Sequence, residues 1–199
     1  MKTKIPIVAV VVVLLTAVSA CAVLSKDIYS DTVIQAGNEY EVVKIHDDAT
    51  VGMTGGKVQY SLDTTDVSTF NLFGGYIQSL HVYDSSKSYM YGGEIGRALV
   101  LSGSGAAHVL GGIVGLEIRI YDSGVLTVHG HAFEWEPFTS LGTEGFLSGY
   151  LLDGTPFRTH LRMLPEPFPG SHVLLVPEPS MFVMFSACTL IFLKRRRSS

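Results

Sequence analysis

Paired glycines recur along the middle of this chain at almost constant intervals. They stand at Gly55-Gly56, Gly74-Gly75, Gly92-Gly93 and Gly111-Gly112, and successive pairs are 19, 18 and 19 residues apart. A weaker copy begins at Ala36-Gly37, so five units occupy about residues 36–129. Units this short do not bury their own apolar faces, so neighbouring units must stack to build a continuous core.

Each unit has the same order of residue types. An alternating apolar segment follows the glycine pair, an Asp or Ser corner comes next, and a second segment rich in β-branched and aromatic residues completes the unit. Alternation with a period of two between Gly and Asp/Ser clusters predicts strands. We therefore expect an all-β chain: a short single-stranded β-solenoid, parallel β-helix-like, with about five coils. The pattern resembles the Gly-Gly-x-Ile/Val repeats of bacterial β-helix proteins.

The repeat also predicts which residues form the corners and which face inward. The glycine pairs suit one corner because glycine tolerates positive φ and close backbone approach, and Asp or Ser side chains suit the other because they bond to backbone groups. The expected residues of this second corner are Asp47, Asp84, Ser102 and Asp122. The expected inward pairs are Val43/Ile45, Tyr60/Leu62, Leu80/Val82, Ala98/Val100 and Ile118/Ile120, with Tyr83, Leu101 and Tyr121 pointing out.

The repeat stops after His131, and aromatic residues then become frequent, as in a cap over the open end of a solenoid. Residues 147–156 contain an Asp153-Gly154 turn and predict a hairpin, with which residues 160–163 and 172–176 are expected to pair. The predicted organisation is a signal peptide at 1–20, solenoid repeats at 27–130, a β cap at 131–164, a Pro-rich linker at 165–175 and a terminal segment at 176–199.

The N-terminus has the features of a secretory signal peptide. Lys2 and Lys4 precede an apolar run at residues 7–15, and small residues lead to a cleavage site after Ala20. Cleavage there leaves Cys21 as the first residue, and residues 18–21 loosely resemble a bacterial lipobox, in which this Cys carries a lipid. An ordinary signal peptide followed by a cysteine is the alternative.

The C-terminus carries a three-part signal. The motif Val176, Pro177, Glu178, Pro179 and Ser180 is followed by an apolar run at residues 181–193 and by the basic cluster Lys194, Arg195, Arg196 and Arg197. The run is shorter than the roughly 20 residues of a membrane-spanning helix. Positive charge at its end predicts a cytoplasmic terminus and an exported body.

These three parts together resemble the PEP-CTERM sorting signal of Gram-negative bacteria that make exopolysaccharide. The resemblance implies that an exosortase-type membrane enzyme recognises and processes the Pro-Glu-Pro element. It further implies a hydrophobic sorting helix, transient anchoring in the inner membrane, and a final location at the cell surface or in an extracellular matrix. A permanent membrane anchor is the alternative for the same segment.

The exported body is acidic. Residues 22–176 contain 8 Lys and Arg against 17 Asp and Glu, a net charge of −9, which argues against nucleic acid as a partner. Cys21 and Cys188 lie in or beside the terminal segments, so the body contains no disulfide. We expect packing and hydrogen bonds to stabilise it.

Few residues suggest chemistry. Stacked Asp and Ser corners would place carboxylates about one strand spacing apart, which fits either a cation or carbohydrate edge or ordinary turn caps, and turn caps are favoured. His129 and His131 have the spacing of two metal ligands, and Glu134 and Glu136 flank Trp135 like a carboxylate pair beside a sugar-stacking ring. Surface or capping roles are favoured for both groups, so we predict no catalytic residue, no metal and no cofactor.

Three functions therefore stand in order of preference. The first is a non-catalytic structural or adhesive solenoid outside the cell, with extracellular polysaccharide as a partner. The second is a carbohydrate- or cation-binding module that uses the Asp/Ser edge. The third is a small polysaccharide-active enzyme, which rests on analogy with larger β-helix enzymes.

Overall fold

A computed structural model describes residues 25–138, 143–164 and 172–177. The predicted signal peptide, Cys21, the basic cluster and the sorting motif after Pro177 lie outside the described residues. Every regular element within them is a β-strand, which confirms the all-β class. The strands are β1 (Ser25–Ile28), β2 (Thr32–Ile34), β3 (Glu39–Ile45), β4 (Thr50–Thr64), β5 (Thr69–Val82), β6 (Lys87–Met90), β7 (Glu94–Leu101), β8 (Ala106–Val109), β9 (Ile113–Val114), β10 (Glu117–Tyr121), β11 (Val125–Pro137), β12 (Glu144–Leu151), β13 (Pro156–Leu164) and β14 (His172–Pro177).

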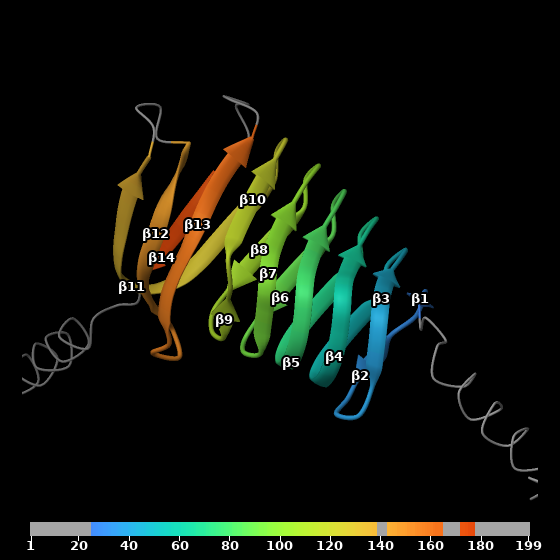
Figure 1. Ribbon diagram of the computed structural model, residues 1–199. Helices are drawn as coiled ribbons and strands as arrows, with labels where there is room; N and C mark the ends of the chain where they lie inside the picture. The colour runs from blue at the N-terminus through green and yellow to red at the C-terminus, as the bar shows by residue number, and fades with distance from the viewer. Residues whose placement is uncertain (1–24, 139–142, 165–171, 178–199) are drawn as a thin grey trace, which may run out of the picture.

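These strands stack into a solenoid of about five turns (Figure 1). The front sheet contains β1, β3, the second halves of β4 and β5, β7, β10 and β13. The back sheet contains β2, the first halves of β4 and β5, β6, β8, the first half of β11 and β14. Neighbouring strands within each sheet are parallel because successive coils run in the same direction.

Columns of apolar side chains fill the space between the two sheets, with one residue from each coil. An inward column of the front sheet, at most 1% exposed, consists of Val43, Leu62, Leu80, Leu99 and Ile118. In the back sheet the large side chain of Phe70 is followed in the next two coils by the small side chains of Ser88 and Ala107. All three are buried, so the size of the core side chains varies from coil to coil along the rod.

The inward register differs from the prediction in the fourth coil. Leu101 is fully buried and pairs with Val82 and Ile120 on either side. Val100, which was expected inside, is half-buried in an outward-facing column. The predicted inward pair Ala98 and Val100 is therefore wrong by one residue, and Leu99 and Leu101 face inward instead.

The cause is a missing residue in the third coil. Between Ile77 and Ser79 this coil has one residue, whereas the second and fourth coils have two at the equivalent place. The third coil thus lacks the β-bulge of its neighbours, and positions counted from its glycine pair fall one residue early. The second coil accordingly turns Leu62 and Thr64 inward rather than the predicted Tyr60 and Leu62.

The glycine pairs lie at one corner of the coil. Gly92 shows why the first glycine is required, because a Cβ there would lie 2.7 Å from the carbonyl oxygen of Phe73 in the preceding coil. The second position has positive φ in every unit, which glycine adopts without steric cost. These residues are Gly37, Gly56, Gly75, Gly93 and Gly112.

Aspartate occupies the opposite corner in four of the five coils. The residue with positive φ is in turn Asp47, Asp66, Asp84, Gly103 and Asp122. Aspartate is one of the few residues with a side chain that tolerates this conformation. The predicted Ser102 lies one residue before the position, which Gly103 fills, and Asp66 belongs to the corner although it was not predicted there.

An antiparallel hairpin follows the fifth coil. Strand β11 continues beyond the back sheet and pairs with β12, and β12 pairs with β13, both in antiparallel register. Strand β13 then joins the front sheet beside β10. The predicted turn at Asp153-Gly154 connects β12 to β13.

Asp153 attaches this turn to the last glycine corner. Its carboxylate accepts hydrogen bonds from the backbone N–H groups of Thr155 (2.9 Å) and Gly112 (3.1 Å). Partial desolvation opposes ionisation, but these hydrogen bonds outweigh it and lower the pKa of Asp153. The ionised side chain therefore joins the cap to the solenoid.

Strand β14 covers parts of two predicted segments. It pairs in parallel with β11 and extends the back sheet, so the prediction that residues 172–176 pair with the β12–β13 hairpin is wrong. It includes the end of the predicted Pro-rich linker and the first two residues of the sorting motif, Val176 and Pro177.

Candidate binding groove

Two outward-facing columns run side by side along the front sheet. The first consists of Ser61, Ser79, Ala98 and Glu117, and the second of Asp63, His81, Val100 and Arg119. Three successive members of the first column are small. The sheet surface is therefore low along this column, and longer side chains stand on both sides of it.

A shallow groove of about 450 Å³ lies over these small residues. We call it the polar groove. Its lining residues are Tyr60, Ser61, Gln78, Ser79, His81, Arg97, Ala98, Val100, Glu117 and Arg119. Ser79 on its floor is 9% exposed, whereas Tyr60 on its wall is 61% exposed. The groove thus combines a buried polar floor with an accessible aromatic ring.

The bend at which the third coil is one residue shorter than its neighbours forms part of the wall of this groove. Gln78 is the one residue between Ile77 and Ser79, while Tyr60 and Arg97 belong to the two-residue bulges of the coils on either side. The wall is therefore shortest at the centre of the groove. The shortened unit and the groove therefore lie at the same place in the stack.

Two ion pairs supply most of the charge in and beside the groove. Arg119 donates a hydrogen bond to Glu117, which lowers the pKa of the Glu117 carboxyl and raises that of the Arg119 guanidinium. His81 Nδ1 lies 2.9 Å from Asp63 Oδ1 in the second column. The charges of Glu117 and Arg119 compensate each other, and Arg97 is the other arginine of the lining.

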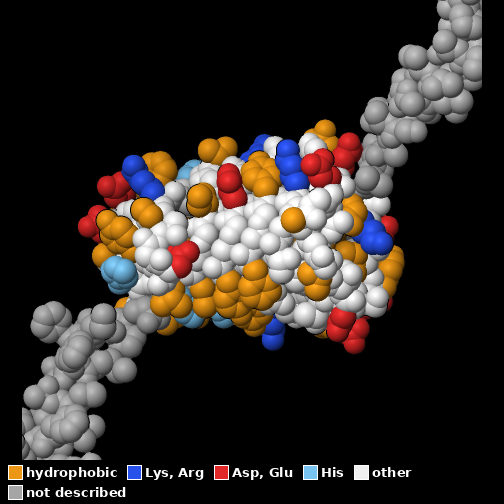
Figure 2. All heavy atoms as spheres, turned by 90° about the horizontal axis from the view of Figure 1, so that it is seen from below, with side chains coloured by type: hydrophobic (Ala, Val, Ile, Leu, Met, Phe, Trp, Pro, Cys, Tyr) orange, Lys and Arg blue, Asp and Glu red, His pale blue; other side chains and the backbone are white. Residues whose placement is uncertain are grey.

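The outer face of the back sheet is different, because its rings stack on one another. We call the set Phe73, Tyr91, Tyr89, His108 and His129 the aromatic ladder. Phe73 and Tyr91 stack with centroids 5.0 Å apart, and Tyr89 and His108 with centroids 4.8 Å apart. Figure 2 shows hydrophobic side chains and histidines along one long edge of the rod and charged side chains gathered along the opposite edge.

Each histidine of the suggested metal pair has its own ring neighbour. The ring centroids of His129 and His108 are 5.9 Å apart, and His131 stacks on Tyr150 with ring centroids 5.5 Å apart. Burial lowers the pKa of His108, and the nearby His129 and Lys87 lower it further. Among the described residues no group of three or more His, Cys, Asp or Glu side chains is placed to hold a metal ion.

The aspartate corner forms a ladder of hydrogen bonds between coils. Asp66 Oδ2 accepts from the backbone N–H of Asp47 at 3.0 Å, and Asp84 Oδ2 accepts from that of Asp66 at 3.2 Å. Asp122 Oδ2 accepts from the backbone N–H of Gly103 at 3.2 Å. The side-chain-to-backbone bonds expected here therefore run from one coil to the next.

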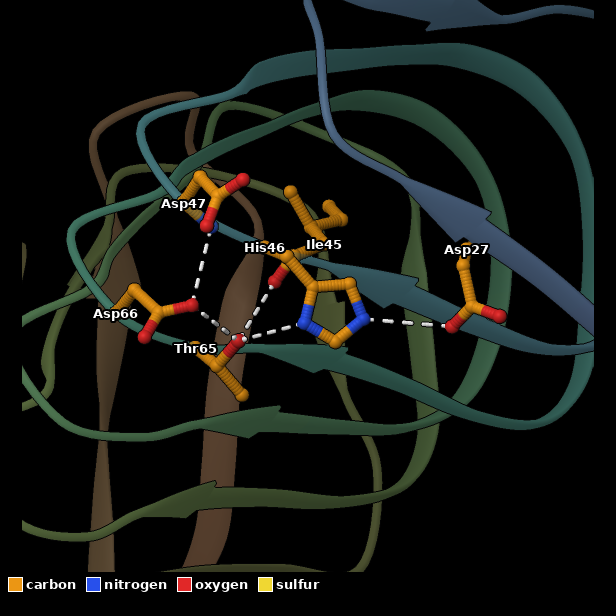
Figure 3. A network of polar contacts seen from close by, with 6 residues as sticks. All are labelled: Asp27, Ile45, His46, Asp47, Thr65 and Asp66. Atoms are coloured by element: carbon orange, nitrogen blue, oxygen red, sulfur yellow. Dashed lines mark hydrogen bonds and ion pairs between the residues drawn. The ribbon is translucent and has the colours of Figure 1, made fainter.

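A polar network at this corner contains an acid, an imidazole and a hydroxyl in sequence (Figure 3). Asp27 Oδ1 lies 3.3 Å from His46 Nε2, and His46 Nδ1 lies 3.2 Å from Thr65 Oγ1. The Thr65 hydroxyl is also 3.1 Å from the carbonyl oxygen of Ile45 and 3.2 Å from Asp66 Oδ2. The backbone N–H of Thr65 donates to Ile45 as well, so this donor is already used and not available to stabilise an oxyanion.

The carboxylates beside Trp135 both lie at the surface of the cap strand. Glu134 and Glu136 are exposed, and Glu136 lies 3.5 Å from Arg158. Trp135 is partly buried and packs against the core. This arrangement matches a charged outer face over a packed aromatic side chain.

The repeat pattern placed the groove residue Tyr60 inside and did not single out Gln78, Ser79 or Arg97. The available signal was the 18-residue spacing between Gly74 and Gly92, where the other spacings are 19.

Comparison with known proteins gives no relative: no family model, no curated protein and no solved structure matches this chain. Within the described part of the chain, no helix is long and apolar enough to cross a membrane.

Proposed function

We propose that this chain is an exported β-solenoid with a structural or adhesive, non-catalytic role at the cell surface or in an extracellular polysaccharide matrix. The proposal joins two features. The terminal sequences have the order of a signal peptide and a PEP-CTERM sorting signal. The body between them is a regular stack of coils, a shape that suits a spacer or scaffold.

The hydrogen-bonding of the aspartate corner carries the non-catalytic part of this proposal. Asp66 and Asp84 use carboxylate oxygens to bind backbone N–H groups of neighbouring coils, and Thr65 bonds to the carbonyl of Ile45. Side chains engaged in this way stabilise the stack. A nucleophile or general base would need a free, correctly oriented polar atom instead.

The same contacts weigh against cation binding at the corner edge. A divalent cation prefers several free carboxylate oxygens, and here the Oδ2 atoms of Asp66, Asp84 and Asp122 already accept hydrogen bonds. A polysaccharide-active enzyme is the least supported function, because the close-set coils offer few long loops from which to build a catalytic cleft.

The proposed route begins at the inner membrane. An exosortase-type enzyme recognises Pro177, Glu178 and Pro179 while Lys194 to Arg197 hold the end of the chain in the cytoplasm. The body then reaches the surface or matrix. Lipidation of Cys21 would add a second anchor.

A topology experiment tests this route. A reporter placed after Gly170 should be active only outside the cytoplasm. Mass spectrometry of the mature protein should find neither residues 1–20 nor the basic cluster. Recovery of an intact Lys194–Arg197 end from extracellular material would rule out processing and leave a permanent anchor.

A further inference from the structure

The polar groove coincides with the one 18-residue unit of the repeat. The second and fourth coils each have a two-residue bulge at the bend, and the third coil has Gln78 alone. A solenoid gains nothing in stacking from a shortened coil, because equivalent residues no longer align across it. Local departures from a regular pattern concentrate at functional sites.

Three side chains of the groove have polar or aromatic atoms without a partner among the described residues. The guanidinium of Arg97 is exposed and makes no hydrogen bond or ion pair, although its charge helps to lower the pKa of Glu117. Tyr60 stacks on no other ring, although 61% of it is exposed. Arg119 Nε, which belongs to the same lining, is buried and has no hydrogen-bond partner. A buried donor without a partner is unfavourable unless water or a ligand supplies one.

We propose that the polar groove binds a glycan, and specifically a sugar unit that carries a carboxylate. A guanidinium such as that of Arg97 forms paired hydrogen bonds with a carboxylate. The exposed ring of Tyr60 offers an apolar face to the C–H side of a sugar ring. The Ser79 hydroxyl and the Gln78 amide supply donors and acceptors for sugar hydroxyls.

The charges around the groove limit how many negative charges a bound ligand can carry. Glu117 and Asp63 are each paired, and the body as a whole carries a net charge of −9. A densely charged polyanion would be repelled by this field. A short uronic acid oligomer carries few charges and can place one carboxylate at Arg97, the arginine of the lining without an ion pair, and the groove volume is within the range of about 300–1,000 Å³ for small-molecule sites.

This inference does not depend on the proposed export route, because it concerns the surface of the folded body. Calorimetric titration of the full-length chain in a polyoxyethylene detergent tests it, with trigalacturonic acid as the acidic probe and cellotriose as the neutral one. We expect the acidic probe to bind at least about tenfold more tightly, since a hydrogen-bonded charge contributes about 1.5–3 kcal/mol.

Surface variants locate the site. Arg97→Gln should weaken binding of trigalacturonic acid at least about tenfold. The matched control is Lys44→Gln, which removes an exposed cation from the same face of the front sheet outside the groove and should leave binding unchanged. The inference is overturned if the wild-type chain does not bind, if cellotriose binds equally well, or if the two variants behave alike.

An insertion tests the role of the shortened coil. One glycine placed between Ile77 and Gln78 restores the bulge of the fourth coil, where Gly96 precedes Arg97. Binding should be lost while the β circular dichroism spectrum is retained. If the variant keeps both its spectrum and its binding, the shortened coil is not needed for the groove to bind a glycan. If the spectrum is lost, the comparison of Arg97→Gln with Lys44→Gln decides whether the groove is the binding site.

Discussion

The two outer faces of this solenoid use exposed side chains in opposite ways. On the back sheet, rings from successive coils cover one another, as in the 5.0 Å stack of Phe73 on Tyr91. On the front sheet, Tyr60 stands beside the small residues Ser61 and Ser79 with no ring next to it. Both faces come from the same repeat, so the repeat alone does not decide their character.

This difference separates residues that stabilise the fold from residues that remain available to bind a ligand. The ring faces of Tyr89 and His108 are turned toward each other at 4.8 Å, so they contribute to the stack and are closed to a ligand. Tyr60 stacks on no other ring, and the side chain of Arg97 makes no hydrogen bond or ion pair, so both gain little from the fold. In a repeat protein, an exposed residue without an equivalent neighbour is the better candidate for binding.

The largest expected effect concerns the core that both faces share. Leu101→Asp buries an unpaired carboxylate between Val82 and Ile120 and should lower the free energy of unfolding by several kcal/mol, about 3–5. Val100→Asp changes the adjacent, outward-facing residue and should cost less than about 1 kcal/mol. Urea denaturation of the full-length chain in detergent measures both.

The reverse order of these two variants would contradict the register. If Val100→Asp were the more damaging change, Val100 would lie inside, and the front face would not present the columns that form the polar groove. The contrast between the front and back faces would then be wrong as well.

The sequence predicted the class of fold because the class depends on local chemistry. Positive φ at the second glycine of each unit, a polar corner opposite, and alternation between them follow from residue type alone. The exchange of Val100 and Leu101 could not be predicted in this way. It depends on which strand contains a bulge, and the length of a unit does not say where within the unit a residue is missing.

The candidate site was harder to predict than the fold for a related reason. Tyr60, Ser79 and Arg97 come from three coils, and each is unremarkable in its own unit. They lie together only because parallel stacking places equivalent positions side by side. The corner was easier to predict, because the tendency of Asp to bond to backbone groups is local, and the Asp84 carboxylate does accept a hydrogen bond from the backbone N–H of Asp66.

A smaller loss of stability is expected from removing one stacked tyrosine of the back face, and the loss is compared with that for an unstacked tyrosine of the front face. Tyr89→Ala removes a ring that lies between His108 and Tyr91 and should cost about 1–2 kcal/mol from lost stacking and cross-strand contact. Tyr60→Ala removes a ring of the same kind that stacks on nothing and should change the free energy of unfolding by less than about 0.5 kcal/mol. Urea midpoints of the two variants give the comparison.

Equal losses for the two tyrosines would show that the contrast between the faces is not one of stability. Glycan titration sharpens the test from the other side. Tyr60→Ala should weaken binding of trigalacturonic acid, whereas Tyr89→Ala should leave it unchanged, because the aromatic ladder lies on the opposite sheet.

The smallest expected effect is a dependence of stability on pH that belongs to the back face. The pKa of His108 is lowered in the folded chain by burial, and His129 and Lys87 add to the shift. The unfolded chain titrates near the ordinary value of about 6.5, so below that pH it binds more protons than the folded chain. The contribution of His108 to stability is therefore fully present above about pH 6.5 and declines as the pH falls.

Comparison of the wild-type chain with His108→Gln separates the contribution of His108 to the pH dependence of stability from that of the other titrating groups. The difference in urea midpoint between the two should be smaller at pH 5.5 than at pH 7.5, because the variant has no imidazole to protonate on unfolding. Gln59→Ala, an exposed change on the front face, should show a difference that does not vary over the same range. A constant or widening gap for His108→Gln would mean that His108 accepts a proton as readily in the folded chain as in the unfolded chain. The stacked environment of the back face would then not favour the neutral imidazole of His108.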